Sequence, residues 1–128
     1  MRKIEFRWRT VFGWQYWNTD KDSSLWLWLN RETLGQYTGQ NDKNGLGIYE
    51  GDVVKSTAKY THSHTIEPVT RIGVVKYCPT VAEFRVFESE DPDDSFGLFP
   101  CAELEVLGNI WDSEEYKERL GPVYFAEE

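Results

Sequence analysis

Short apolar segments separated by turn-forming residues limit, more than any other feature, how this chain can fold. Residues 4–9 alternate apolar and polar side chains, which is typical of a strand with one buried face. Asn44-Gly45 is a strong signal for a tight turn, because both residues accept positive φ. The pattern predicts a mainly β fold, either a small curled antiparallel sheet or an SH3-like barrel. The clearest expected strands cover residues 4–9, 25–29, 71–77, 81–87 and 104–111.

The C-terminal part of the chain carries a single helical pattern. Asp112 or Ser113 is expected to cap this helix, and the acidic residues that follow suit the positive end of a helix dipole. Gly121-Pro122 is expected to end it. Residues 56–70 are polar and predict a long loop or a loose hairpin arm. We expect one domain over residues 1–128, with a β body (1–111), a short helix (112–121) and a tail (122–128).

Composition limits the class of protein. A chain of 128 residues with 40% hydrophobic and 16% aromatic residues can bury a core without disulfide bonds or metals. It contains no run of about 18 apolar residues, the length needed to span a bilayer. No apolar segment follows the basic start at Arg2 and Lys3, as a signal peptide would require. We therefore expect an intracellular protein without membrane contact, in which Cys78 and Cys101 are reduced thiols.

Negative charge is concentrated in the last third of the chain. The net charge is -8, and residues 88–128 hold 13 acidic residues against two basic ones. Such a surface either keeps the protein soluble or binds a basic partner. The net negative charge also argues against a protein that binds nucleic acid through a broad basic surface. The candidate partner-binding residues are Glu88, Glu90, Asp91, Asp93, Asp94, Asp112, Glu114, Glu115 and Glu118.

Aromatic residues are frequent in the first 30 positions. Six tryptophans are many for one small core. They either pack between strands or form an exposed face through which copies of the chain associate. The candidate interface residues are Tyr16, Trp17, Trp26 and Trp28.

The basic N-terminal strand offers a third surface. Arg7 and Arg9 alternate with Phe6 and Trp8, a composition found in proteins that bind single-stranded nucleic acid. In a strand, however, the arginines lie on the face opposite the two aromatic residues. We therefore expect Arg7 and Arg9 on the solvent face, and nucleic-acid binding remains the weaker alternative.

The sequence lacks the residue patterns of known catalytic and metal sites. The spacing of His62, His64, Cys78 and Cys101 matches no zinc module. Asp42 begins a segment that faintly resembles a calcium loop, but Val53 stands where the bidentate glutamate is needed. No nucleophile elbow, phosphate loop or dinucleotide fingerprint is present. We expect no enzyme activity, no metal and no cofactor.

Residues 36–54 carry a more specific pattern. Gln-Tyr-Thr-Gly, Asp-Lys-Asn-Gly and Ile-Tyr-Glu-Gly-Asp-Val-Val follow one another, with Gly-Val-Val at 73–75 and Gly-Asn-Ile at 108–110. This arrangement resembles the YopX family of small phage and prophage proteins over about residues 1–112. Its glycines and asparagine suit turns and its apolar residues suit a core, so the motif predicts a fold rather than a reaction. The motif residues are Tyr37, Thr38, Gly39, Asp42, Asn44, Gly45, Ile48, Tyr49, Glu50, Gly51, Asp52 and Val53.

The resemblance implies a phage- or prophage-encoded, mainly β protein that acts in the cytoplasm of a bacterial host, and it implies no reaction. We expect a non-enzymatic accessory protein that binds a host or phage macromolecule. The acidic third would make it an inhibitor of a host protein that handles nucleic acid or acts in defence. The alternatives are a structural module that forms homo-oligomers through an aromatic face, and nucleic-acid binding through the basic strand.

Overall fold

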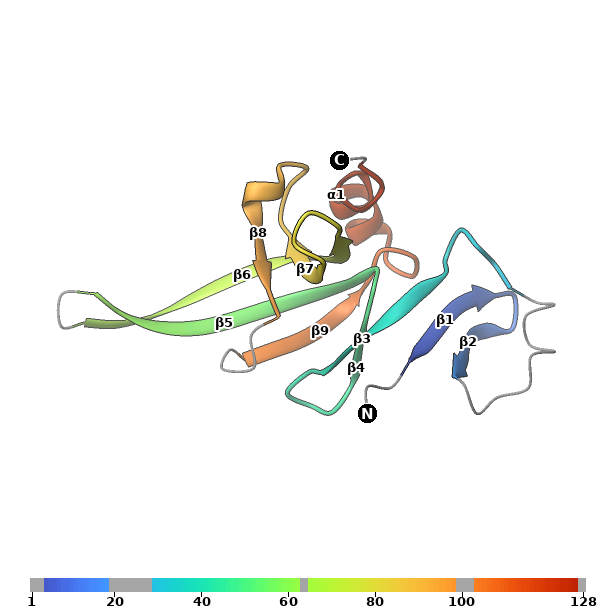
Figure 1. Cartoon of the computed structure of the whole chain (residues 1–128), viewed down its shortest axis with the longest axis horizontal. Coiled ribbons are helices and arrows are strands. Elements are labelled where there is room, and N and C mark those ends of the chain that lie inside the picture. Colours follow the sequence, from blue (N-terminus) through green and yellow to red (C-terminus); the bar gives the residue numbers. More distant parts are fainter. Residues whose placement is uncertain (1–3, 19–28, 63–64, 99–102, 127–128) are drawn as a thin grey trace.

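The structure, a computed structural model, describes residues 4–18, 29–62, 65–98 and 103–126. Two antiparallel sheets and one C-terminal helix form the molecule (Figure 1). The first sheet has the order β2-β1-β3-β4 and the second the order β8-β7-β6-β5-β9. The strands are β1 (Glu5–Thr10), β2 (Gly13–Asn18), β3 (Gly35–Asn41), β4 (Gly47–Tyr49), β5 (Asp52–His62), β6 (Thr65–Cys78), β7 (Glu83–Phe87), β8 (Ser95–Gly97) and β9 (Glu103–Asn109).

The predicted mainly β class is confirmed. Each sheet keeps two edge strands, so the arrangement is a pair of curled, open sheets and not a closed barrel. The expected strands at 4–9, 71–77, 81–87 and 104–111 correspond to β1, β6, β7 and β9. The segment expected as a strand at 25–29 falls, except for its last residue, outside the described residues.

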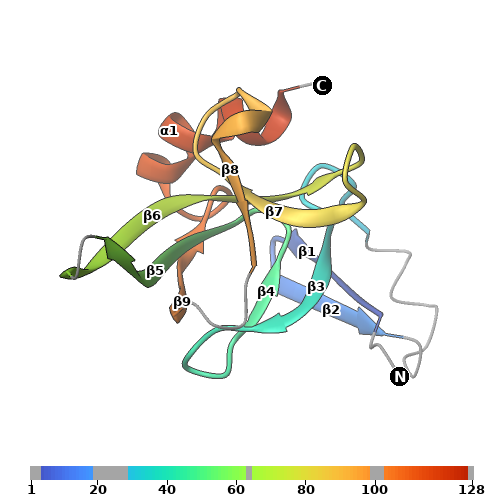
Figure 2. The same ribbon diagram turned by 60° about the vertical axis from the view of Figure 1, so that its left-hand side comes forward.

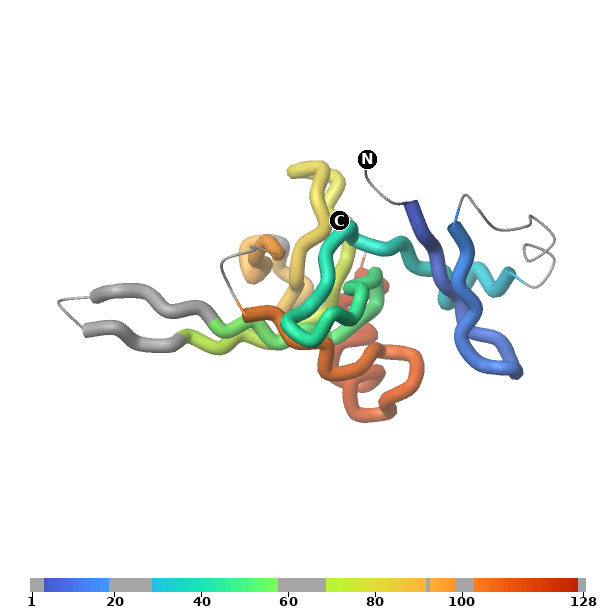
Figure 3. The backbone as a smooth tube through the Cα atoms, turned by 90° about the horizontal axis from the view of Figure 1, so that it is seen from below, coloured from blue at the N-terminus to red at the C-terminus, as the bar shows by residue number. Residues whose placement is uncertain are grey.

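The polar segment 56–70 forms a hairpin arm, the second of the two expected forms. β5 and β6 pair without interruption from Val53 opposite Val74 to His62 opposite Thr65. The arm extends away from the rest of the second sheet (Figure 1), and Figure 3 shows that the coloured parts of β5 and β6 lead away from β1 and β2. Threonine and valine favour extended backbone even where they are not part of a core, so a polar segment can still be a regular strand.

The centre of the second sheet is buried on both faces. Adjacent residues of a strand point to opposite faces, and the pairs Val53-Val54 and Val74-Val75 are all fully buried. Val54 and Val75 pack with Ile48 of β4, while Val53 and Val74 pack under the helix α1 (Glu114–Phe125). Figure 2 shows α1 along one side of β6 and β4 on the other.

The helix is longer than the sequence predicts. Ser113 caps it, as expected, by accepting a hydrogen bond from the Tyr116 backbone N–H at 3.3 Å. It does not end at Gly121, however, but continues through Pro122 to Phe125, so residues 122–125 are not a loose tail. Proline lacks an N–H and removes one helical bond. Burial of Val123 against the sheet outweighs this loss.

The helix C-terminus is also fastened by the sheet. The Lys76 Nζ atom of β6 donates to the backbone carbonyls of Val123 and Ala126, at 3.3 and 2.8 Å. A cation at this end satisfies carbonyls that lack helical partners and complements the helix dipole. The helix therefore ends at Phe125, beside Lys76 of the sheet, four residues after the end at Gly121 that the sequence predicts.

Candidate functional site

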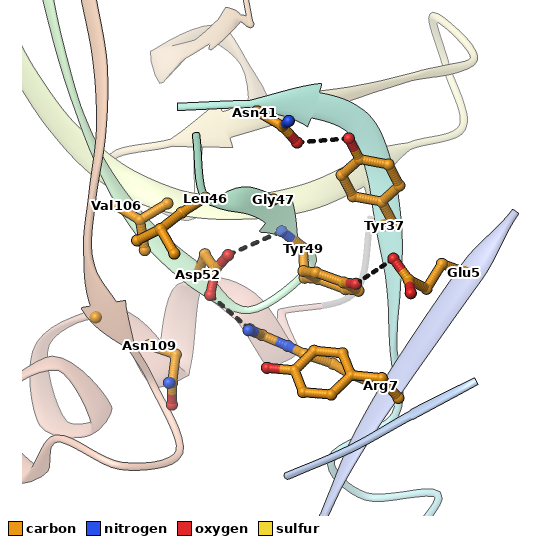
Figure 4. Close-up of a pocket in the computed structure, with 12 residues that line it drawn as sticks. Glu5, Arg7, Tyr37, Asn41, Leu46, Gly47, Tyr49, Asp52, Val106 and Asn109 are labelled. Carbon is orange, nitrogen blue, oxygen red and sulfur yellow. Dashed lines mark hydrogen bonds and ion pairs between the residues drawn. The ribbon is translucent and has the colours of Figure 1, made fainter. Parts of the chain in front are cut away.

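A pocket of about 520 Å³ opens between the two sheets (Figure 4). Its walls come from β1, β2, β3 and β4 of the first sheet and from β5 and β9 of the second. A volume of this size is typical of small-molecule sites. The lining residues are Glu5, Arg7, Tyr16, Tyr37, Asn41, Leu46, Gly47, Tyr49, Asp52, Val106, Gly108 and Asn109.

Arg7 and Asp52 form a buried ion pair in this pocket. The Arg7 Nη2 and Asp52 Oδ1 atoms are 2.5 Å apart, and the two side chains are 8% and 2% exposed. The other oxygen, Asp52 Oδ2, accepts from the Tyr49 backbone N–H at 2.8 Å. Burial raises the pKa of Asp52, and the charge of Arg7 offsets part of this effect. The pair therefore joins the two sheets through charge rather than apolar packing.

The expected place of Arg7 on the solvent face is wrong. Both Arg7 and the adjacent Trp8 are buried, so both faces of β1 are covered at this point. The guanidinium lies 4.5 Å from the ring centroid of Trp14 and 4.7 Å from that of Tyr49. Such cation–π contacts stabilise a desolvated arginine. Arg9, in contrast, is exposed as expected.

Tyrosines form the aromatic wall of the pocket. The Tyr49 ring lies 5.4 Å from the Tyr37 ring and 5.7 Å from the Tyr16 ring, between centroids. The Tyr49 hydroxyl donates to Glu5 Oε2, and the Tyr37 hydroxyl donates to Asn41 Oδ1, each at 2.6 Å. Burial, followed by the Glu5 carboxylate, raises the pKa of Tyr49 above that of a free tyrosine. Tyr49 therefore stays a protonated hydrogen-bond donor at neutral pH.

Asp42 has a structural role in the turn between β3 and β4. Its Oδ1 accepts from the backbone N–H groups of Asn44 and Leu46, both at 2.9 Å. Its Oδ2 accepts from the Val106 N–H of β9 at 3.0 Å. Burial opposes its ionisation, but these three bonds outweigh burial and lower the pKa of Asp42. One carboxylate thus closes the β3–β4 turn and fastens it to the second sheet.

The segment from Glu50 to Asp52 makes the other turn of the motif. Gly51 has a φ of 90°, a conformation that favours glycine. A Cβ atom at Gly51 would lie 2.9 Å from the Trp111 Nε1 atom. Glu50 Oε1 accepts from the Gln36 backbone N–H at 3.0 Å, and burial raises the pKa of Glu50.

The remaining motif residues also have structural places. Ile48 and Val53 are fully buried, and Thr38 is buried with its hydroxyl accepting from the Gln40 N–H at 3.2 Å. Gly39 and Gly45 have φ angles of 92° and 86°. The motif therefore builds turns and core, as predicted, and in addition its two tyrosines and Asp52 line the pocket.

The acidic candidate residues fall into two groups. In one, Glu88 pairs with Arg71, Asp112 with Arg9 at 2.9 Å, and Glu115 with Arg119 at 3.3 Å. The residues of the other group are exposed and have no ion pair within the described part of the chain. They are Glu90, Asp91, Asp93, Asp94, Glu114 and Glu118.

Asp112 has a clear structural role. Besides Arg9, it accepts hydrogen bonds from Trp14 Nε1 at 2.8 Å and from Asn109 Nδ2 at 3.2 Å. Burial opposes its ionisation, but the Trp14 and Asn109 bonds and the nearby arginine outweigh burial and lower the pKa of Asp112. Asp112 thus connects β1 and β2 to the turn before α1, and its carboxylate is engaged within the molecule.

Two of the four candidate aromatic residues, Tyr16 and Trp17, lie within the described part of the chain, and as neighbours in β2 they point to opposite faces. Tyr16 lines the pocket, Trp17 is half-buried beside Phe6, and Trp26 and Trp28 lie outside the described residues. Among the exposed apolar residues that the sequence analysis does not name are Val11 and Phe12, at 94% and 81% exposure in the β1–β2 turn, and Phe125 of α1. These three line a second pocket together with Trp111.

Comparison with protein families agrees with the motif. The family model described as YopX protein matches residues 7–116. The chain belongs to the YopX family. It is accordingly a phage- or prophage-type protein, and the match runs from Arg7 in β1 to Tyr116 in the first turn of α1. Comparison with curated proteins gave no match.

In residues 4–18, 29–62, 65–98 and 103–126, no three or more His, Cys, Asp or Glu side chains lie together as a metal site. Cys78 is buried and reduced, while His64 and Cys101 lie outside these ranges. The helix described here is too short and too polar to cross a bilayer.

Proposed function

We propose that this YopX protein is a non-enzymatic accessory protein that acts inside the bacterial host by binding a basic surface of a host or phage protein. The basic surface would be the nucleic-acid groove of a protein that handles nucleic acid or acts in defence. The observation that supports this proposal is the second acidic group: six exposed carboxylates without an ion pair among the described residues. They lie in the β7–β8 connection and in the first part of α1.

Exposed, uncompensated carboxylates favour association with a basic surface. They lose little hydration in the free protein, and their field accelerates encounters with a positively charged groove. The N-terminal end of α1 also has a fixed geometry, because Ser113 caps it and Asp112 is held by Arg9. A fixed array of charges can match the spacing of a basic groove better than a mobile one.

The arrangement of titratable groups supports a binding role without turnover. Asp42 and Asp52 accept backbone hydrogen bonds that close turns, and Glu50 accepts one from the Gln36 backbone of β3. Tyr49 is held as a protonated donor to Glu5. Each of these groups is occupied by the fold, whereas a general base or nucleophile must be free to exchange a proton with a substrate.

Charge-matched variants test the proposal. Each variant removes two negative charges from exposed side chains, so non-specific electrostatic effects are equal. The loop variant is Glu90→Gln with Asp93→Asn, the helix variant is Glu114→Gln with Glu118→Gln, and the control variant is Glu32→Gln with Glu103→Gln. The immobilised proteins are incubated with bacterial lysate, and bound proteins are identified by mass spectrometry.

The proposal expects basic, nucleic-acid-binding proteins on the unmodified chain and on the control variant. It expects their loss from the loop variant, the helix variant or both, because these remove the charges that match the groove. Equal capture by all four proteins would contradict the proposal. Capture of acidic partners alone would contradict it as well.

Homo-oligomer formation is a second candidate function, and one observation favours it. Val11, Phe12 and Phe125 are exposed and line one apolar pocket with Trp111. Exposed aromatic side chains that gather in this way are common at protein interfaces. Light scattering tests it: Phe12→Ser should lower the measured mass of an oligomer. A concentration-independent monomer of the unmodified chain would exclude it.

A further inference from the structure

We propose that the tyrosine-lined pocket binds a basic, proline-rich segment of a partner protein in the polyproline II conformation. This inference concerns a different surface from the exposed carboxylates and does not depend on the proposed function. It begins from three tyrosine rings that line the pocket. Tyr49 is the middle ring, because its centroid lies 5.7 Å from that of Tyr16 and 5.4 Å from that of Tyr37. Tyr16 is 44% exposed, so the row is open to a partner.

The length of the row suits a polyproline II helix. This helix has three residues per turn and advances about 9 Å per turn. Two successive ring spacings of 5.7 and 5.4 Å give the row a length comparable with one turn. A single turn of the peptide can therefore lie along all three rings. Grooves lined by aromatic side chains are a recurring site for proline-rich segments, whose stiff backbone loses little entropy on binding.

The polar groups available at the opening match such a backbone. The Tyr16 hydroxyl has no hydrogen-bond partner within the described residues. Asn41 accepts from the Tyr37 hydroxyl through Oδ1, which leaves its exposed amide N–H groups for a ligand. Polyproline II has no internal hydrogen bonds, so its carbonyls can accept from both donors. Proline has no N–H group that would need an acceptor in return.

The row is ordered before a ligand binds. The Tyr49 hydroxyl donates to Glu5 and the Tyr37 hydroxyl donates to Asn41, each at 2.6 Å. A Cβ atom at Gly47 would lie 3.1 Å from a Tyr37 ring atom and 3.2 Å from a Tyr49 ring atom, so the glycine leaves both rings their place. Figure 4 shows these two rings one above the other, with Asn41 at one end. An ordered site loses little conformational entropy when it binds.

Charge favours a basic peptide over a nucleic-acid strand, the other ligand that rows of aromatic rings bind. The chain carries a net charge of -8. Arg7, the one cation among the described residues that line the pocket, is paired with Asp52. The field of such a chain repels a phosphate backbone and attracts a peptide with arginines beside its prolines. Leu46, 55% exposed at the same opening, offers an apolar contact to the peptide.

A titration with defined peptides tests the proposal. The full chain, labelled with ¹⁵N, is titrated with two arginines followed by ten prolines, which form about three turns. The Gly47 backbone amide and the Asn41 side-chain amide are followed by NMR, and both should shift saturably. A peptide of two arginines followed by ten glycine and serine residues has the same charge but a flexible backbone, so it should bind about tenfold more weakly. Glutamates in place of the arginines should weaken binding, most at low salt.

Matched variants locate the site through the Gly47 amide. Tyr16→Ala removes one ring and should weaken binding about tenfold, whereas Tyr16→Phe keeps the ring and should weaken it less. Asn41→Asp keeps an oxygen for the Tyr37 hydroxyl but loses the amide donor. It should weaken binding although its added charge attracts the arginines, so charge cannot explain the loss. Tyr77→Ala is the control, because Tyr77 lies on β6 outside this pocket and is 41% exposed.

Four results would overturn the proposal. The first is the absence of a saturable shift with the proline peptide, and the second is equal binding of the glycine and serine peptide. The third is binding that is unchanged in Asn41→Asp or equally weakened in Tyr77→Ala, and Asn41→Asp decides alone if Tyr16→Ala fails to fold. The fourth is tighter binding of a single-stranded oligonucleotide than of the proline peptide, because that would assign the tyrosine row to nucleic acid.

Discussion

Arg7 and Asp52, 45 positions apart in the sequence, form an ion pair of 2.5 Å that joins the two sheets. Arg7 comes from the middle of β1, and Asp52 is the first residue of β5. The same Asp52 also closes the turn after β4 by accepting from the Tyr49 N–H. One side chain thus fixes a local turn and the position of one sheet against the other.

Removing Asp52 should destabilise the fold strongly. Asp52→Asn leaves the buried charge of Arg7 without its counter-ion, which typically costs about 3–5 kcal/mol in free energy of unfolding. The matched exposed pair is Glu115 with Arg119, and Glu115→Gln should change the free energy by about 0.5 kcal/mol or less. Urea unfolding measures both. A change below about 1 kcal/mol for Asp52→Asn would show that the ion pair between Arg7 and Asp52 does not hold the two sheets together.

Removing the Asp42 carboxylate should destabilise the turn between β3 and β4. Asp42→Ala removes three hydrogen bonds between a carboxylate and backbone N–H groups, so we expect a loss of about 2–4 kcal/mol. Hydrogen exchange should rise at Asn44, Leu46 and Val106, which lose their acceptor. Protection of these three amides that matches the unmodified chain would contradict the role assigned to Asp42.

Acid should weaken the same turn. The pKa of Asp42 is lower in the folded chain than the unfolded value of 3.8. Its contribution is therefore complete above pH 3.8 and is lost as the pH falls through the folded pKa. Asp42→Asn should flatten this part of the curve of unfolding free energy against pH. An identical slope in both proteins would show that another group causes the loss of stability at low pH.

Glu50 should have the opposite effect on the pH dependence. Burial raises its pKa above the unfolded value of 4.5, so the folded chain holds a proton that the unfolded chain releases. Its contribution to stability is complete below pH 4.5 and is lost as the pH rises through the folded pKa. Glu50→Gln keeps an oxygen for the Gln36 N–H and should gain stability relative to the unmodified chain as the pH rises over this range. If the free energies of unfolding of Glu50→Gln and the unmodified chain differ by the same amount at every pH, the pKa of Glu50 is not raised by folding.

Comparing Gly51 with Gly45 separates two costs of an alanine substitution: the contact of the new Cβ atom with a neighbour, and the unfavourable backbone conformation. Both have positive φ, at 90° and 86°, so alanine should cost about 1–2 kcal/mol at each for the backbone alone. Only Gly51 lies against another group, with its Cβ position 2.9 Å from Trp111 Nε1, whereas the space at Gly45 is open. Gly51→Ala should therefore melt at a lower temperature than Gly45→Ala. Equal melting temperatures would mean that Trp111 moves freely.

Local patterns in the sequence predict β1, β6, β7 and β9 and the turn at Asn44-Gly45. The alternation in residues 4–9 and the Asn44-Gly45 signal depend on neighbours within a few positions, and both correspond to the structure. The end of the helix could not be predicted in this way. It is determined by the burial of Val123 and by Lys76, which is 47 positions away from Val123 in the sequence.

The pocket could not be predicted from the sequence for the same reason. Alternation places Arg7 opposite Trp8, but it does not show that a second sheet covers the arginine face. The pairing of Arg7 with Asp52 depends on how the sheets meet, which no local pattern contains. The sequence makes Tyr16 a candidate interface residue, and only the structure shows that it also lines the pocket with Tyr37 and Tyr49 of the motif.

The most direct test of the proposed binding role is the salt dependence of capture from lysate. The immobilised chain and its charge-matched variants are washed from about 0.05 M to about 0.5 M salt, over which the screening length falls from about 14 Å to about 4 Å. We predict that basic partners are retained at low salt and released as salt rises, and that the loop and helix variants release them earlier than the control. Retention that does not change with salt, or that is equal in all variants, would contradict binding through the acidic residues.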